Sequence, residues 1–315
     1  MKKYLKSLFA LSLLFSFPML MILGRQAGEG IGDGLQLAYR SALPALFPSA
    51  VVCGILAELL EYLPLPPNHT LWITAQLCGF PLGIKSVCRA YQRKLIDRRT
   101  AIALSLCSAN ASPAFLILYV GGKLFGNLRV GVYFFIIQSL ISFLIAYLSG
   151  ALIPCKSIGG STESVFIILG TGISNATIGC LGLTGYICLF SALAAPMKPF
   201  GWFKFIHGFL ELTGGISKLN SDQLLLCGAM IGFSGISVLL QNASFLAQTR
   251  LPIMPMCCGK ILYGVLMPTL LYLIINNHLM VLYISFGILF FWISFDKFRK
   301  RRYNDFIQHK RRRYL

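Results

Sequence analysis

Long apolar runs follow one another along almost the whole chain, and this pattern constrains the fold more than any other feature. They cover residues 8–24, 41–62, 128–153, 165–196, 256–276 and 279–295. About 20 apolar residues in a helix span the hydrocarbon core of a bilayer. Hydrophobic residues make up 56% of the chain and charged residues only 12%, too few to cover a core in water. The sequence therefore predicts an all-α polytopic protein of the cell membrane.

Four segments between these runs do not form ordinary spans. Two are short and rich in glycine, LCGFPLGIKSVC at 77–88 and FLELTGGISKLN at 209–220. The other two, at 104–120 and 228–246, are long enough to cross a membrane but are interrupted by Gly, Ser, Asn and Pro. Lipid cannot satisfy the N–H and C=O groups of a non-helical backbone, so such breaks persist only beside protein or a water-filled cavity. We expect short re-entrant segments and broken helices that face a cavity.

The order of these segments repeats along the chain. Each half contains a span, a short segment, a broken segment and a second span; Gly83-Ile84 matches Gly215-Ile216, and Ser108 matches Ser234. We therefore divide the chain into an N-terminal span and outer loop (1–40), a first repeat (41–154), a second repeat (155–277), a last span (278–296) and a basic cytoplasmic tail (297–315). Broken helices in matching positions of two halves are typical of transporters.

Charge differs between the two repeats and indicates how they are oriented. Residues 85–99 carry six Lys and Arg residues, whereas the matching loop has only Lys218, beside Asp222. Cytoplasmic loops are the ones enriched in Lys and Arg. This asymmetry favours two inverted repeats, about eight spans and both termini in the cytoplasm. The alternative treats all four odd segments as re-entrant, with six spans and parallel repeats.

The basic residues lie beside the predicted membrane segments. The net charge is +18, and nine Lys and Arg residues lie in 297–315. This placement predicts contact with anionic membrane lipid and not with nucleic acid. A homo-oligomer is compatible with the sequence.

The sequence predicts neither an enzyme nor a cofactor or metal site. The ten cysteines form no C-x-x-C pair, and the four histidines are scattered. No G-x-S-x-G, H-E-x-x-H, P-loop or paired carboxylates are present.

We expect the four odd segments to supply a substrate-binding site. Glu211 is the sharpest candidate, because an acidic group at membrane depth needs a cavity or a partner. A half-helix that begins near Pro113 would offer free N–H groups. Lys85 and Lys218 are interpreted as anchors that flank the short segments. The expected substrate-binding residues are Gly79, Pro81, Gly83, Ser108, Asn110, Ser112, Glu211, Thr213, Gly215, Ser234, Gly235, Ser237 and Gln241.

The blocks that contain these residues resemble the YlbJ family, the sporulation integral membrane proteins of spore-forming Firmicutes. The turn G-F-P-x-G-I-K, the break N-x-S-P and the ending F-G are present in the first half, and L-E-L-T-x-G and G-I-S-V-x-x-Q in the second. The resemblance covers roughly residues 41–275. The histidine of the family's S-V-H-A-Q block is Leu239 or Leu240 here. The resemblance implies a nucleoside recognition or Gate domain, related to parts of nucleoside and ferrous-iron transporters, and a role in sporulation.

Two functions are compatible with these features of the sequence. The first is a permease-like protein that moves a small polar solute or ion through a site between the repeats. The second is a non-transporting membrane scaffold required for spore assembly. Polar side chains of the four segments that meet in one open cavity would favour the permease.

Overall fold

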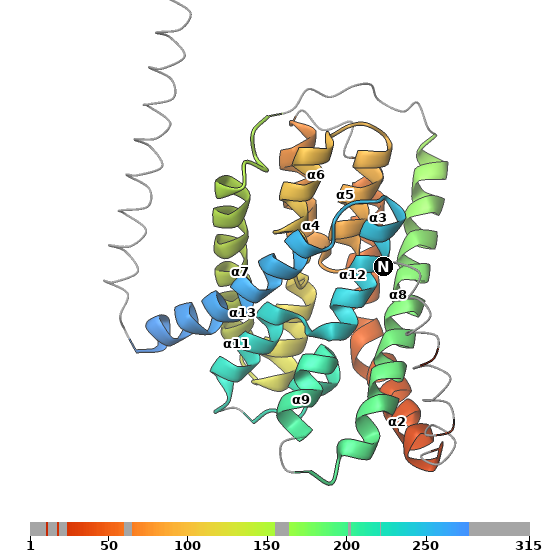
Figure 1. Cartoon of the computed structure of the whole chain (residues 1–315), viewed down its shortest axis with the longest axis vertical. Helices are drawn as coiled ribbons and strands as arrows, with labels where there is room; N and C mark the ends of the chain where they lie inside the picture. Colours follow the sequence, from red (N-terminus) through yellow and green to blue (C-terminus); the bar gives the residue numbers. More distant parts are fainter. Residues whose placement is uncertain are drawn as a thin grey trace, which may run out of the picture. The chain divides into compact units, whose positions relative to one another are not determined.

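Helices make up 81% of the described chain, and the described residues contain no strand (Figure 1). The computed structural model describes residues 24–59, 65–154, 164–200, 203–220 and 222–276, together with residues 11 and 18. The predicted last span and basic tail, and most of the predicted first span, lie outside these residues. Residues up to Pro268 form one compact unit and those from Thr269 a second. All four odd segments of the sequence lie in the first unit.

The helices fall into two series. Those of the first half are α2 (Gly24–Leu37), the π-helix η1 (Ala38–Ala42), α3 (Leu43–Leu59), α4 (Pro67–Cys78), α5 (Leu82–Gln92), α6 (Arg98–Ser105), the π-helix η3 (Ala114–Leu124) and α7 (Leu128–Leu148). Those of the second half are α8 (Val165–Ala194), the 3₁₀ turn η4 (Ala195–Met197), α9 (Phe203–Leu210), α10 (Leu212–Ile216), α11 (Leu224–Phe233), α12 (Gly235–Gln248) and α13 (Met254–Ile275).

Several helices are long and apolar enough to cross a membrane. Four such stretches lie in the described residues, at 128–148, 165–197, 224–248 and 254–275. The helices of 24–42 and 46–56, bent by 60°, add a fifth if they are one span. The all-α prediction is thus confirmed for the described residues, and the lengths and compositions of these helices are consistent with the predicted membrane protein. The total of eight or six spans stays a prediction, because two of the proposed spans lie outside the described chain.

The repeated order of segments is present in the helices. The series α3, α4–α5, α6–η3, α7 is followed by α8, α9–α10, α11–α12, α13. Each expected interruption separates two helices, at 79–81, 106–113, Glu211 and Ser234. The four breaks are therefore confirmed, whereas the opposite orientation of the repeats needs further support.

The predicted outer loop before residue 41 is wrong, because residues 24–37 form helix α2. Its many glycines indicate a loop by sequence, yet two of them serve helix packing. A Cβ on Gly30 would lie 2.6 Å from the Ser191 carbonyl oxygen, and one on Gly34 would lie 2.9 Å from the Cys188 Cα. A Cβ on Gly54 of α3 would likewise lie 2.7 Å from the Gly172 carbonyl oxygen of α8. Small residues let α2 and α3 pack directly on α8, as is common between membrane helices.

Two groups of contacts between helix termini lie at opposite ends of the first unit. At one end the Asn68 side chain donates to the carbonyl oxygens of Ala151 and Ile153, and the hydroxyl of Thr249 lies 3.6 Å from the Cys88 sulfur. At the other end Lys198 pairs with Asp33 at 2.6 Å. Figure 1 shows α5 and α6 toward one end and α2 and α9 toward the other. The loop after α5 and the loop after α10 therefore lie at opposite ends.

Candidate functional site: two backbone crossings and a basic pocket

In the first repeat, the short segment crosses the broken helix at close range. The Phe80 N–H donates to the Asn110 carbonyl oxygen at 2.7 Å. Gly79 has φ +68°, and a Cβ there would lie 2.5 Å from the Ser112 nitrogen. A Cβ on Gly83 would collide with the Ser108 carbonyl oxygen. Glycine is thus required on both sides of the turn, because only backbone without side chains can approach so closely.

Side chains from neighbouring helices satisfy the unwound backbone of this first break. Gln138 of α7 accepts from the Ala111 N–H at 3.0 Å and donates to the Ala111 carbonyl oxygen at 2.9 Å, as a paired strand would. The Cys107 carbonyl oxygen accepts from Ser142 and from the Asn110 amide. The same amide donates to Gln76 at 2.9 Å. The break therefore has its own set of buried polar partners, as non-helical backbone at membrane depth requires.

In the second repeat, Glu211 lies at the break between α9 and α10. Its carboxylate accepts from the Thr213 N–H at 3.0 Å and from the Gly214 N–H, and the residue is only 1% exposed. A Cβ on Gly215 would collide with Gly208, so α9 and α10 fold tightly back on each other. This carboxylate acts as the N-cap of α10 and satisfies N–H groups that lack a helical partner.

The same break meets the interruption between α11 and α12. Ser234 has φ +71° and ends α11, and a Cβ on Gly235 would lie 3.1 Å from the Leu212 nitrogen. Both repeats thus contain a crossing of a short segment and a broken helix. Beyond it, the Gln241 and Asn242 side-chain oxygens on α12 are buried without a hydrogen-bond partner.

All thirteen expected substrate-binding residues are buried, but the structure does not gather them in one place. The hydrogen bonds of Asn110 are made inside the first repeat and those of Glu211 inside the second. Pro81 lines a small cavity of about 20 Å³ against α3 and α8. No described contact joins Glu211 to Asn110, Ser112 or Gln241, so the shared site stays a prediction without support.

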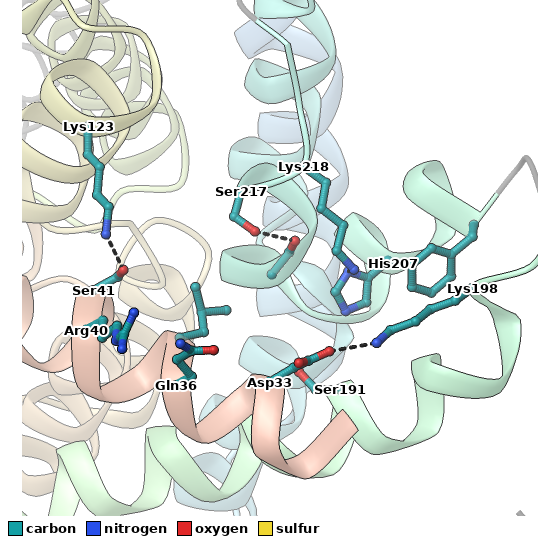
Figure 2. A pocket seen from close by; sticks show the side chains of 13 residues that line it. Asp33, Gln36, Arg40, Ser41, Lys123, Ser191, Lys198, His207, Ser217 and Lys218 are labelled. Carbon is teal, nitrogen blue, oxygen red and sulfur yellow. Dashed lines mark hydrogen bonds and ion pairs between the residues drawn. The ribbon is translucent and has the colours of Figure 1, made fainter. Parts of the chain in front are cut away.

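A larger cavity, of about 370 Å³, opens at the end of the unit that contains α2 and α9 (Figure 2). We call it the basic pocket. It is lined by Asp33, Gln36, Leu37, Arg40, Ser41, Lys123, Ser191, Lys198, Phe203, His207, Gly214, Ser217 and Lys218. Four of these residues are Lys or Arg and one is Asp, which leaves an excess of three positive charges. The lining comes from both repeats and from α2, so the pocket exists only in the folded unit.

Lys218 is the most buried cation of the basic pocket and lies beside the buried His207. Lys218 Nζ lies 3.1 Å from His207 Nδ1 and 4.3 Å from the ring centre of Phe203. Both residues lie outside the membrane-spanning helices. Burial, together with the charges of Lys218 and Lys198, lowers the pKa of His207 to about 4. The imidazole is therefore neutral near pH 7, and its Nδ1 can accept from the Lys218 ammonium.

Sequence reasoning missed most of this pocket. Arg40, Lys123 and Lys198 belong to no motif, and Lys218 was expected to be an anchor. Lys85 was expected to be one too, but its Nζ donates to the Asn175 oxygen of α8 at 2.8 Å. One feature of the sequence could have indicated the basic pocket. The inverted arrangement places Arg40, Lys123 and Lys198 on the outer side, where Lys and Arg are normally depleted.

The chain matches no protein-family model, no curated protein and no solved structure. Within the described residues, no three His, Cys, Asp or Glu side chains are grouped so that they could hold a metal ion. The two crossings and the basic pocket are therefore the basis on which a function can be inferred.

Proposed function

We propose that the chain is a membrane permease built from two inverted repeats, and that it moves a small anionic solute. The observation that carries this proposal is the basic pocket, a cavity with an excess of three positive charges that segments of both repeats build together. The two crossings supply the broken backbone that transporters use at membrane depth.

The two ends of the first unit support the inverted orientation. The segments that this orientation places outside are those near residues 33–41, 123, 198 and 214–218, and all of them meet at the basic pocket. Those that it places inside meet at the opposite end, where Asn68 binds Ala151 and Thr249 lies beside Cys88. In parallel repeats the loops after α5 and α10 would face the same side. In the inverted orientation, the six Lys and Arg residues of 85–99 face the cytoplasm, as the positive-inside rule expects.

The charge of the basic pocket selects the class of solute. Only Asp33 opposes the four Lys and Arg residues, and it already pairs with Lys198. Lys218 is half-buried, so its field is screened less than that of an exposed lysine. Clefts lined by one sign of charge concentrate ligands of the other sign. A volume of about 370 Å³ accommodates a small phosphate or carboxylate but not a folded protein partner.

The resemblance of the breaks to the YlbJ family is the reason to propose that this transport serves sporulation. The scaffold interpretation remains the rival, since the polar side chains of the four segments do not share the basic pocket. A direct assay of transport separates the two.

The test is uptake into proteoliposomes that contain the purified full-length protein. Labelled inorganic phosphate, glycerol 3-phosphate, citrate and uridine are offered singly, with protein-free vesicles as background. We expect saturable uptake of at least one anion and none of neutral uridine. The double variant Lys123→Gln/Lys218→Gln should lose this uptake, whereas Arg129→Gln, which removes an exposed charge outside the pocket lining, should retain it. Absence of anion uptake by a correctly folded protein would refute the proposal and favour the scaffold.

A further inference from the structure

Lys260 is a fully buried cation in α13, and the basic pocket does not explain it. The residue is 1% exposed, and its Nζ donates to the Ala109 carbonyl oxygen at 2.8 Å. The ring centre of Tyr263 lies 4.7 Å from the same nitrogen. No described residue forms an ion pair with Lys260. An ammonium without a counter-ion is costly to bury, and such residues within membrane helices usually have a function.

The backbone carbonyl oxygens of the first break do not need a charged hydrogen-bond donor at position 260. The neighbouring carbonyl oxygens of Cys107 and Ala111 accept from the neutral side chains of Asn110 and Gln138. An uncharged amide on α13 would serve the Ala109 carbonyl oxygen in the same way. The helix itself approaches the break closely, because a Cβ on Gly259 would collide with the Leu106 carbonyl oxygen. A lysine at this position therefore offers something beyond a hydrogen bond, namely a proton that it can lose.

Near the contact between Lys260 and Ala109, three buried side-chain oxygen atoms of neighbouring residues have no hydrogen-bond partner in the described structure. They are Ser108 Oγ, Asn110 Oδ1 and the Tyr263 hydroxyl. Ser108 and Asn110 flank Ala109 in the chain, and the Tyr263 hydroxyl lies near the side chains of Asn110 and Ser142 without forming a hydrogen bond. All three atoms can accept from an ammonium, and the two hydroxyls can donate to a neutral amine.

The surroundings of Lys260 favour a proton, and not a solute, as the species that this residue binds. The ring of Tyr263 contacts Lys260, and the titratable neighbour of Tyr263 is the Cys107 thiol. The side chains that bind the same break, Gln76, Gln138 and Ser142, are uncharged. None of the cavities described above includes Lys260. A proton needs no cavity, whereas a solute would.

We propose that Lys260 is a reversible proton-binding site that couples proton movement to the transport proposed above, on which this inference rests. In the protonated form, its N–H bond to the Ala109 carbonyl oxygen ties α13 of the second repeat to the break of the first. When the N–H bond breaks, the proton passes to water on one side and the electron pair stays on Nζ. The neutral amine can still donate an N–H to the Ala109 carbonyl oxygen, but the hydrogen bond loses its charge assistance, which weakens the tie between α13 and the break. A proton taken from water on the other side restores the charge assistance.

Three substitutions separate this role from a purely structural one. Lys260→Arg keeps a cation and a donor at the break but does not release its proton, because arginine stays protonated in proteins. Lys260→Gln keeps only a neutral donor, and Lys260→Met keeps only the length. We expect Lys260→Arg to unfold near the wild-type temperature and yet to carry none of the labelled anion (inorganic phosphate, glycerol 3-phosphate or citrate) that the wild type takes up. A structural lysine would instead be rescued by arginine, so wild-type uptake by Lys260→Arg would overturn the proposal.

A second measurement needs no solute. The melting temperature of the purified protein is recorded from pH 5 to pH 10 for the wild type, Lys260→Gln and Lys260→Met. We expect the wild-type profile to contain a pH-dependent component that both variants lack. Identical profiles would show that Lys260 does not exchange its proton, which overturns the inference whatever the uptake assays give. The expected difference without uptake of any of the three anions would support the proton site and count against the proposed transport.

Discussion

The Lys218 ammonium lies 3.1 Å from His207 Nδ1, so the most buried cation of the basic pocket rests on a neutral imidazole. The side-chain nitrogen closest to the Lys218 ammonium therefore carries no opposing charge, although the charges of Asp33 and Glu211 also act on Lys218. The contact also makes the region sensitive to acid, because a second positive charge on His207 would face the first.

The lowered pKa of His207 predicts a loss of stability in acid. The imidazole has a pKa of about 4 in the folded protein, against an ordinary value of 6.5. The unfolded chain therefore binds more protons between these values, and stability falls as the pH falls from about 6.5 toward 4. The melting temperature should decline over this range in the wild type and decline less in His207→Gln. Equal declines in the two proteins would show that His207 has no such shift.

Gly83 should tolerate no larger side chain, because its Cβ would collide with the Ser108 carbonyl oxygen. Gly83→Val should force the two backbones apart and cost about 1–3 kcal/mol or more, as overpacking does. Gly28→Ala is a matched control in α2, where nothing lies within 4 Å. The control should unfold at or above the wild-type temperature. A Gly83→Val protein with unchanged melting temperature would contradict the observed crossing.

Gln138 should be essential for the first break, because it pairs with both backbone groups of Ala111. Gln138→Leu leaves a buried N–H and C=O without partners, at about 1–3 kcal/mol each. The exposed Gln248 provides the control substitution Gln248→Leu. Thermal unfolding of the two variants in one detergent should differ by several degrees. Similar melting temperatures would mean that water or another group replaces Gln138.

Glu211 should stabilise the second break as a cap and not through its charge alone. Glu211→Ala removes the acceptor for the Thr213 and Gly214 N–H groups and should cost about 1–2 kcal/mol. Glu211→Gln retains one acceptor oxygen and should recover part of this loss. Chemical unfolding of both variants measures the difference. If glutamine restores nothing, the carboxylate has a further role, such as the substrate contact expected from the sequence.

The breaks could be predicted from the sequence, because Gly79, Pro81 and the Ser108–Pro113 stretch act locally on the backbone. Helix α2 could not, since the difference between a loop glycine and Gly30 depends on α8, more than 150 residues away. The basic pocket gathers lysines from positions as distant as 123 and 218, which no local pattern relates. The role of Asn110 could not be predicted for the same reason, because its amide donates a hydrogen bond to Gln76, which is distant in the sequence. Lys260 is visible in the sequence as one charge in an apolar run, a signal that the predicted site did not include.

The orientation of the two repeats can be measured directly by the accessibility of single cysteines in whole cells. The ten native cysteines are replaced, and one cysteine is introduced either at Lys94, after α5, or at Asp222, after α10. The inverted arrangement predicts that a membrane-impermeant maleimide labels the cysteine at 222 in intact cells and the one at 94 only after permeabilisation. Labelling of both positions from the same side would contradict the inverted repeats and, with them, an outward-facing basic pocket.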